Sequence, residues 1–143
     1  MEPTLLISDG DAESSEVYRR LFAEHGFAVE TASHGLDCLE KLYETRPALL
    51  VLDFELRWGG SDNVLSLLRA AGNRPQIPVI LTAPANCPND MSDFLKPPVV
   101  RLLRKPFTPM ALLEAVQAAL ATKDGNEPFA FHWPSPMVQT FAF

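Results

Sequence analysis

The chain has 143 residues and a formal net charge of −6, and 47% of its residues are hydrophobic and 21% charged. This size and composition are typical of a single globular domain and exclude a disordered chain, a coiled coil and a collagen-like fibre. The sequence has no apolar run near the ~20 residues of a membrane span, no basic and apolar leader, and only two cysteines. We therefore expect a cytoplasmic domain that does not enter a membrane and keeps its thiols reduced.

The acidic charge balance also bears on the partners of the chain. No basic run is longer than two residues, whereas nucleic-acid affinity depends on basic side chains that neutralise phosphates. We expect proteins or metal cations, and not DNA or RNA, as ligands.

Short apolar runs alternate with amphipathic stretches between residues 4 and 121, which is typical of a parallel sheet covered by helices. In chain order, the pattern predicts a strand at 4–7, a helix at 12–25, a strand at 27–31, a helix at 35–45 and a strand at 48–52. It continues with a helix at about 61–71, a strand at 77–81, a short helix at 88–96, a strand at 99–103 and a last helix capped by Thr108. The strand at 48–52 is apolar throughout, as in strands buried on both faces. Strand–helix units of this length predict an open α/β sandwich.

Polar side chains follow the predicted strands, at the edge where an open parallel sheet binds its ligands. They are Asp9 after the first strand, Asp53 after the third, Thr82 after the fourth and Lys105 after the fifth. Carboxylates are ligands that Mg²⁺ prefers, and a carboxylate beside such a cation can act as a nucleophile and form an acyl phosphate. A hydroxyl and an ammonium group can then bind the phosphoryl oxygens. Each residue alone is more typical of an ordinary polar strand end, but their coincidence at one edge favours a phosphoryl-binding site.

Four segments carry a resemblance to a known family: LLISDGD around Asp9, LLVLDFEL around Asp53, PVILTA around Thr82 and LLRKPF around Lys105. Over residues 4–121 the chain resembles the receiver domain of two-component response regulators, the CheY-like family. The resemblance implies a flavodoxin-like (βα)5 three-layer sandwich with the strand order 2-1-3-4-5. It also implies that Asp53 accepts a phosphoryl group from a histidine kinase or a phosphotransfer protein.

The resemblance further implies a role for each residue of the site. Asp9 and Asp53 would hold Mg²⁺, together with the backbone carbonyl of Glu55. Thr82 and Lys105 would bind and sense the phosphoryl group. The peptide bond between Lys105 and the proline after it would be cis. No enzymatic activity is expected apart from hydrolysis of the bound phosphate.

Several residues near the site depart from the family pattern. Receivers usually carry two adjacent acids after the first strand, and here the second is Gly10, so Mg²⁺ should bind less tightly. Asp11 either compensates as a metal ligand or only caps the following helix. The loop after Asp53 carries Arg57 and Ser61 where the family has Pro and Gly. We expect this loop to have a shape of its own.

The aromatic residues also depart from the family pattern. The family's aromatic switch position on the fifth strand is Leu102 here, which we expect to be an ordinary core residue. Five aromatic residues lie near the C-terminus: Phe129, Phe131, Trp133, Phe141 and Phe143. We expect a receiver domain over 1–122 and an aromatic, Pro-rich tail over 123–143. Such a tail packs on its own domain, joins a homodimer or docks on a partner, because exposed aromatic side chains are costly in water.

The leading hypothesis is a stand-alone receiver that signals to a downstream protein through its fourth and fifth helices and its tail. The alternative is a pseudo-receiver, the same fold acting as a phosphorylation-independent binding module because of Gly10. A phosphatase of the haloacid-dehalogenase type, with Asp9 as nucleophile, is disfavoured because it leaves Asp53 without a role. Substitution of Asp53 by Asn separates the first two hypotheses, since it abolishes signalling by a phosphoacceptor and leaves the binding of a pseudo-receiver unchanged.

Overall fold

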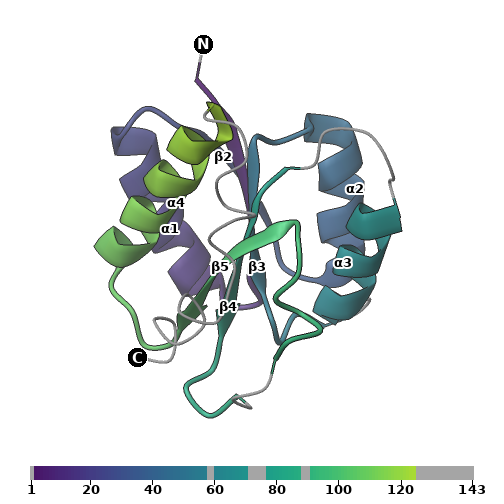
Figure 1. Cartoon of the computed structure of the whole chain (residues 1–143). Helices are drawn as coiled ribbons and strands as arrows, with labels where there is room; N and C mark the ends of the chain where they lie inside the picture. The colour runs from purple at the N-terminus through teal and green to yellow at the C-terminus, as the bar shows by residue number, and fades with distance from the viewer. Residues whose placement is uncertain (1, 58–59, 71–76, 88–90, 125–143) are drawn as a thin grey trace.

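The computed structural model describes residues 2–57, 60–70, 77–87 and 91–124. Figure 1 shows a central sheet between two pairs of helices. In chain order the elements are β1 (Thr4–Ser8), α1 (Ala12–Glu24), β2 (Ala28–Ala32), α2 (Gly35–Thr45), β3 (Leu49–Asp53), α3 (Gly60–Ala70), β4 (Val79–Ala83), β5 (Val99–Arg104) and α4 (Pro109–Asp124). The strands and all but one of the predicted helices lie close to their predicted positions.

The five strands are all parallel, in the order β2-β1-β3-β4-β5. This order confirms the predicted flavodoxin-like topology. Helices α1 and α4 cover one face of the sheet, and α2 and α3 cover the other (Figure 1). Strands β3 and β4 are buried at every position because helices cover both of their faces. The arrangement brings the carboxyl ends of β1, β3, β4 and β5 to one edge of the sheet.

The hydrophobic core has two parts, one on each face of the sheet. On one face, Phe22 from α1 and Leu112 from α4 pack against alternate residues of β1 and β3. On the other face, Cys38 from α2 and Val64 from α3 pack against the remaining residues of these strands. Leu102 on β5 is 1% exposed and belongs to this second part, as predicted for an ordinary core leucine.

The connection between β4 and β5 differs from the prediction. The helix expected over 88–96 is wrong for the described residues 91–96, which form one turn. In that turn the amides of Phe94 and Leu95 donate to the carbonyl of Met91, at 2.8 and 3.1 Å. The turn cannot be extended into a helix, because Pro97 and Pro98 have no amide donor and restrict the residue before them. The buried side chains of Met91 and Leu95 still reach the core.

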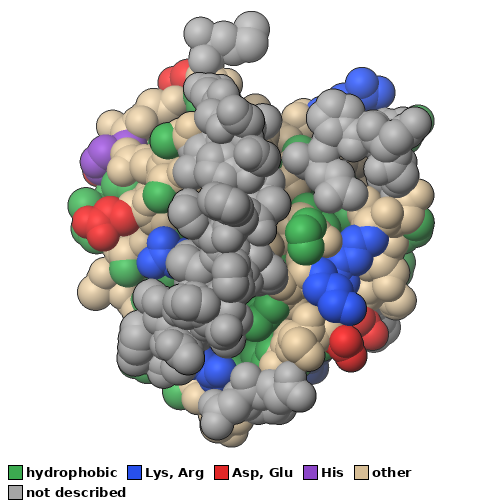
Figure 2. All heavy atoms as spheres, viewed as in Figure 1, with side chains coloured by type: hydrophobic (Ala, Val, Ile, Leu, Met, Phe, Trp, Pro, Cys, Tyr) green, Lys and Arg blue, Asp and Glu red, His purple; other side chains and the backbone are tan. Residues whose placement is uncertain are grey.

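One side chain of α3 holds this turn in place. The Arg69 guanidinium donates four hydrogen bonds of 2.9–3.3 Å to the backbone carbonyls of Asp93, Phe94, Lys96 and Pro97. A longer helix would satisfy most of these carbonyls with its own amides. Figure 2 shows basic side chains on the surface where α3 and this connection lie. Arg69 therefore takes the place of the helical hydrogen bonds that are missing here.

None of the described helices is long and apolar enough to cross a membrane. Helix α4 continues to Asp124, past the predicted domain boundary at 122. The rest of the predicted aromatic tail, 125–143, lies outside the described residues, so its role stays a prediction.

Candidate functional site

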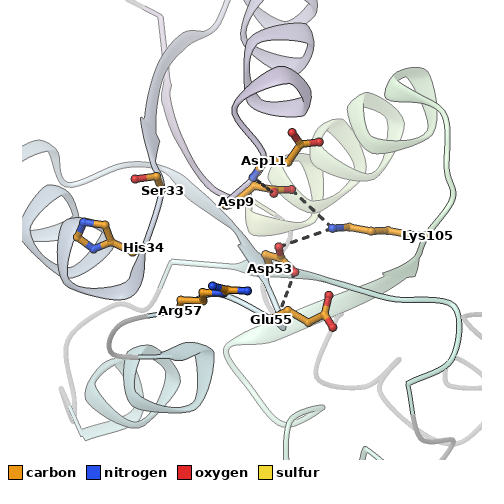
Figure 3. A pocket seen from close by; sticks show the side chains of 9 residues that line it. Asp9, Asp11, Ser33, His34, Asp53, Glu55, Arg57 and Lys105 are labelled. Atoms are coloured by element: carbon orange, nitrogen blue, oxygen red, sulfur yellow. Dashed lines mark hydrogen bonds and ion pairs between the residues drawn. The ribbon is translucent and has the colours of Figure 1, made fainter.

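The polar residues at the predicted strand ends lie together at the carboxyl edge of the sheet (Figure 3). Asp9 follows β1, Asp53 is the last residue of β3, and Lys105 follows β5. Thr82 on β4 lies opposite Asp53 in the pairing of the two strands. Three of these residues border an open cleft of about 710 Å³. The cleft is lined by Asp9, Gly10, Asp11, Ser33, His34, Asp53, Glu55, Arg57 and Lys105.

Lys105 joins the two buried carboxylates across the cleft. Its Nζ lies 3.8 Å from Asp9 Oδ2 and 3.6 Å from Asp53 Oδ2. Both acids are only 6% exposed, so they depend on this cation for charge compensation. The Lys105 side chain is itself 35% exposed, which leaves its ammonium group accessible from the cleft. The peptide bond between Lys105 and Pro106 is cis, as predicted.

Local backbone amides hold the second oxygen of each acid. The amide of Asp11 donates to Asp9 Oδ1 at 2.8 Å, and the amide of Glu55 donates to Asp53 Oδ1 at 3.0 Å. Burial raises the pKa of Asp9, and the negative charge of Asp53 acts in the same direction. The Asp11 amide and the Lys105 ammonium oppose this shift. Each carboxylate thus has one oxygen held by a backbone amide and the other directed toward Lys105.

Asp11 caps helix α1. Its side chain accepts hydrogen bonds from the Glu13 amide at 3.3 Å and from Ser14 Oγ at 2.7 Å. These bonds, the one from Ser14 above all, hold the pKa of Asp11 below its usual value. In Figure 3 the Asp11 carboxylate points away from Asp53. The sequence left two roles open for Asp11, a metal ligand or a helix cap, and the structure shows the helix cap.

Gly10 leaves the site with few metal ligands. It contributes no side-chain oxygen, although a Cβ at this position would meet only the Ser33 carbonyl, at an ordinary 3.7 Å. No group of three or more His, Cys, Asp or Glu side chains in the described part of the chain is arranged to hold a metal. Mg²⁺ commonly binds through one or two carboxylates with waters and phosphate oxygens. The two buried carboxylates of Asp9 and Asp53 match that number of protein ligands.

Thr82 lies beside Asp53 on the neighbouring strand but does not line the cleft. The residue is 2% exposed, and its Oγ1 has no hydrogen-bond partner among the described residues. Its carbonyl accepts the amide of Phe54, the residue after Asp53, at 2.7 Å. A buried polar group without a partner costs about 1–3 kcal/mol, so this hydroxyl is a buried donor that no described residue uses.

Three residues that line the cleft were not predicted from the strand ends: Ser33, His34 and Arg57. His34 caps α2, with its Nδ1 accepting the Asp37 amide at 3.2 Å. Arg57 comes from the loop after β3, and Ser61 joins that loop to α3 by donating to the Phe54 carbonyl at 2.9 Å. The departure of this loop from the family pattern was the only sequence feature that pointed to Arg57.

The sequence and the fold match one protein family. The sequence pattern of the response regulator receiver domain matches residues 5–117. This chain belongs to that family. The predicted assignment to two-component phosphorelay signalling is thereby confirmed. Receiver domains are signalling modules.

Two curated relatives show how much of a response regulator the chain spans. It is 29% identical to the protein Rrf1 of Nitratidesulfovibrio vulgaris over 126 residues, which cover 85% of this chain and 86% of Rrf1. It is 30% identical to the transcriptional regulatory protein PrrA of Mycobacterium leprae over 118 residues, which cover 82% of this chain and 50% of PrrA. The chain thus spans most of Rrf1 but about half the length of PrrA.

Solved structures agree on the fold. The receiver domain of the Francisella response regulator 1452 superposes with a TM-score of 0.75 at 21% identity, covering 85% of this chain and 99% of that one. The chemotaxis response regulator CheY4 of Vibrio cholerae gives a TM-score of 0.73 at 19% identity, covering 83% and 99%. At such identities the likeness establishes the fold, while the chemistry of the site rests on its own residues.

Proposed function

We propose that this receiver accepts a phosphoryl group on Asp53 from a histidine kinase or phosphotransfer protein and signals by contact with a downstream protein. The observation that carries the proposal is the position of Lys105 between the buried carboxylates of Asp9 and Asp53 in an open cleft. The hydroxyl of Thr82, which has no partner in the described part of the chain, lies on the neighbouring strand. Together these groups provide a nucleophile, a cation and a hydrogen-bond donor for one phosphoryl group.

In the transfer, a carboxylate oxygen of Asp53 attacks the phosphorus atom of a phosphohistidine on the donor protein. The new P–O bond forms as the P–N bond breaks, and the electron pair stays on the imidazole nitrogen, which is then protonated by solvent. Mg²⁺ held by Asp9, Asp53 and the Glu55 carbonyl would neutralise part of the phosphoryl charge.

The phosphoryl group would change the contacts of Lys105 and Thr82. It replaces the single charge of the carboxylate with about −1.5 to −2 on the phosphoryl oxygens, which draws the ammonium group and the hydroxyl toward them. The Thr82 carbonyl accepts the Phe54 amide, and the Phe54 ring packs edge-on against Phe94 with their centroids 4.9 Å apart. A movement of Thr82 would therefore reach the β4–β5 connection. We propose that the downstream protein contacts the β4–β5 connection and α4. The connection takes the place of the short helix that the sequence predicted over 88–96.

A pseudo-receiver is the second candidate function, and two residues favour it. Gly10 provides no metal ligand, and the side chain of Asp11 is already bonded to the first turn of α1. In that case the same surfaces would bind a protein partner without phosphorylation.

The substitution Asp53→Asn tests the proposal. Wild-type protein is incubated with acetyl phosphate and Mg²⁺, and covalent phosphorylation is followed by intact-mass spectrometry. We expect the wild type to gain one phosphoryl group and Asp53→Asn to gain none. Asp62→Asn removes an exposed acid in the first turn of α3 and should match the wild type. An unmodified wild type would favour the pseudo-receiver, and a modified Asp53→Asn protein would mean that another residue is the acceptor.

A further inference from the structure

The backbone of Arg57 is held at the rim of the cleft. Its carbonyl accepts a hydrogen bond of 2.6 Å from the amide of Gly35, the first residue of α2. The preceding residue, Leu56, is 5% exposed, and its amide donates to the Asp53 carbonyl at 3.1 Å. The chain is thus fixed from Asp53 to Arg57, and the Arg57 side chain starts from a defined point beside the acceptor.

The guanidinium group of Arg57 is aimed into the cleft. Figure 3 shows it pointing toward Asp53 from the side opposite to Lys105, and both cations line the same cleft. Among the described residues, none forms an ion pair or side-chain hydrogen bond with this guanidinium. A guanidinium presents five N–H donors in a planar fork, which suits the oxygens of a phosphoryl group.

The charges around the acceptor favour a second cation. Before phosphorylation, Lys105 pairs with the carboxylates of both Asp9 and Asp53, and Arg57 lines the same cleft. An acyl phosphate on Asp53 carries about −1.5 to −2 of charge in place of the single charge of the carboxylate, and Lys105 alone cannot balance this charge together with that of Asp9. Gly10 adds no carboxylate to attract a divalent cation, so side-chain cations must carry more of the compensation.

We propose that Arg57 binds the phosphoryl oxygens on Asp53 from the side opposite to Lys105, so that two side-chain cations hold the group between them. The inference rests on the proposed function, because it requires a phosphoryl group on Asp53. An acid at position 10 would help to bind Mg²⁺, and Arg57 then provides part of the positive charge that this Mg²⁺ would supply. With Arg57 in this role, the receiver binds a phosphoryl group with a reduced dependence on Mg²⁺.

The test measures the dissociation constant of beryllofluoride, a phosphoryl mimic, by calorimetry at high and low Mg²⁺ concentration on the full chain. The variants are Arg57→Gln, Arg57→Lys and a control, Arg20→Gln, whose side chain pairs with Glu16 on α1 outside the cleft. We expect Arg57→Gln to weaken binding about 10-fold and Arg57→Lys to stay within about 3-fold of the wild type. The loss in Arg57→Gln should be larger at low Mg²⁺, and Arg20→Gln should match the wild type.

A Gly10→Asp background supplies the missing acid, for which the backbone has room. In that background, we expect the effect of Arg57→Gln at high Mg²⁺ to shrink to less than about 3-fold. An undiminished effect would overturn the compensating role of Arg57. Equal affinities of Arg57→Gln and wild type at both Mg²⁺ concentrations would overturn the inference and leave the proposed function intact, provided that Asp53 is still phosphorylated by acetyl phosphate. A wild type that neither binds beryllofluoride nor gains a phosphoryl group would overturn both.

Discussion

The rim of the cleft and the β4–β5 connection satisfy their polar groups in different ways. At the rim, each acid bonds to an amide two residues further along the chain, as Asp9 does with Asp11 and Asp53 with Glu55. In the β4–β5 connection, four carbonyls depend on Arg69, which lies 24 to 28 residues earlier: those of Asp93, Phe94, Lys96 and Pro97. One oxygen of each acid is therefore held by a local contact, whereas the connection depends on one distant side chain.

The residues of the β4–β5 connection contribute to the stability of the fold, whereas those of the rim contribute to the chemistry of the cleft. The rim concentrates two buried carboxylates near one ammonium group, an arrangement that suits phosphoryl chemistry and costs stability. The connection contributes apolar burial and hydrogen bonds but no group that lines the cleft. Substitutions in the two regions should therefore change stability in opposite directions.

The largest expected effect is that of Arg69→Ala. Four carbonyls would lose a charged donor, so we expect the free energy of unfolding to fall by about 2–4 kcal/mol. Urea unfolding followed by circular dichroism measures the change. The control is Arg20→Ala, which removes an exposed ion pair with Glu16 and should cost less than about 1 kcal/mol. Equal losses in the two variants would contradict the importance given to Arg69.

A smaller effect is expected where the two regions meet, at the edge-on ring pair of Phe54 and Phe94. Phe54 follows Asp53, and Phe94 belongs to the turn that Arg69 holds. A double-mutant cycle of Phe54→Leu and Phe94→Leu should give a coupling of about 0.5–1.5 kcal/mol in the free energy of unfolding. A coupling near zero would mean that the loop after Asp53 and the β4–β5 connection are energetically independent. It would contradict the proposed coupling from Thr82 to the surface that contacts the downstream protein.

The parts of the molecule that the sequence predicts are those encoded locally. Unbroken apolar runs such as 48–52 identify strands covered on both faces, and the polar residue after each run identifies the ligand-binding edge. Asp9, Asp53 and Lys105 meet at the cleft for that reason. The strand order came from the resemblance to receivers, because the alternation of strands and helices alone leaves it open.

The parts that the sequence did not predict depend on distant contacts. The apolar spacing of 91–95 is equally consistent with one turn and with a longer helix, and the choice is made by two prolines and by Arg69 on another element. Arg57 was visible only as a departure from the family pattern. Its place in the cleft depends on the Gly35 amide at the start of α2, which no local pattern reveals.

The smallest expected effect is a gain in stability at the rim, from Asp9→Asn. Burial raises the pKa of the Asp9 carboxyl above its ordinary value of 3.8, so the folded state binds its proton more tightly than the unfolded state. Stability due to this group is complete below pH 3.8 and is lost as the pH rises through the raised pKa. At pH 7, an amide avoids that loss and keeps an oxygen for the Asp11 amide.

We expect Asp9→Asn to raise the free energy of unfolding at pH 7 by less than about 1 kcal/mol, because the contact with Lys105 offsets part of the burial cost. Thermal unfolding of both proteins across pH 3 to 8 measures the difference, which should vanish at the acidic end. The same variant should bind Mg²⁺ and beryllofluoride more weakly, since it removes one of the two buried carboxylates. A loss of stability at pH 7 would instead mean that the Asp9–Lys105 pair stabilises the fold, and the rim would then resemble the β4–β5 connection.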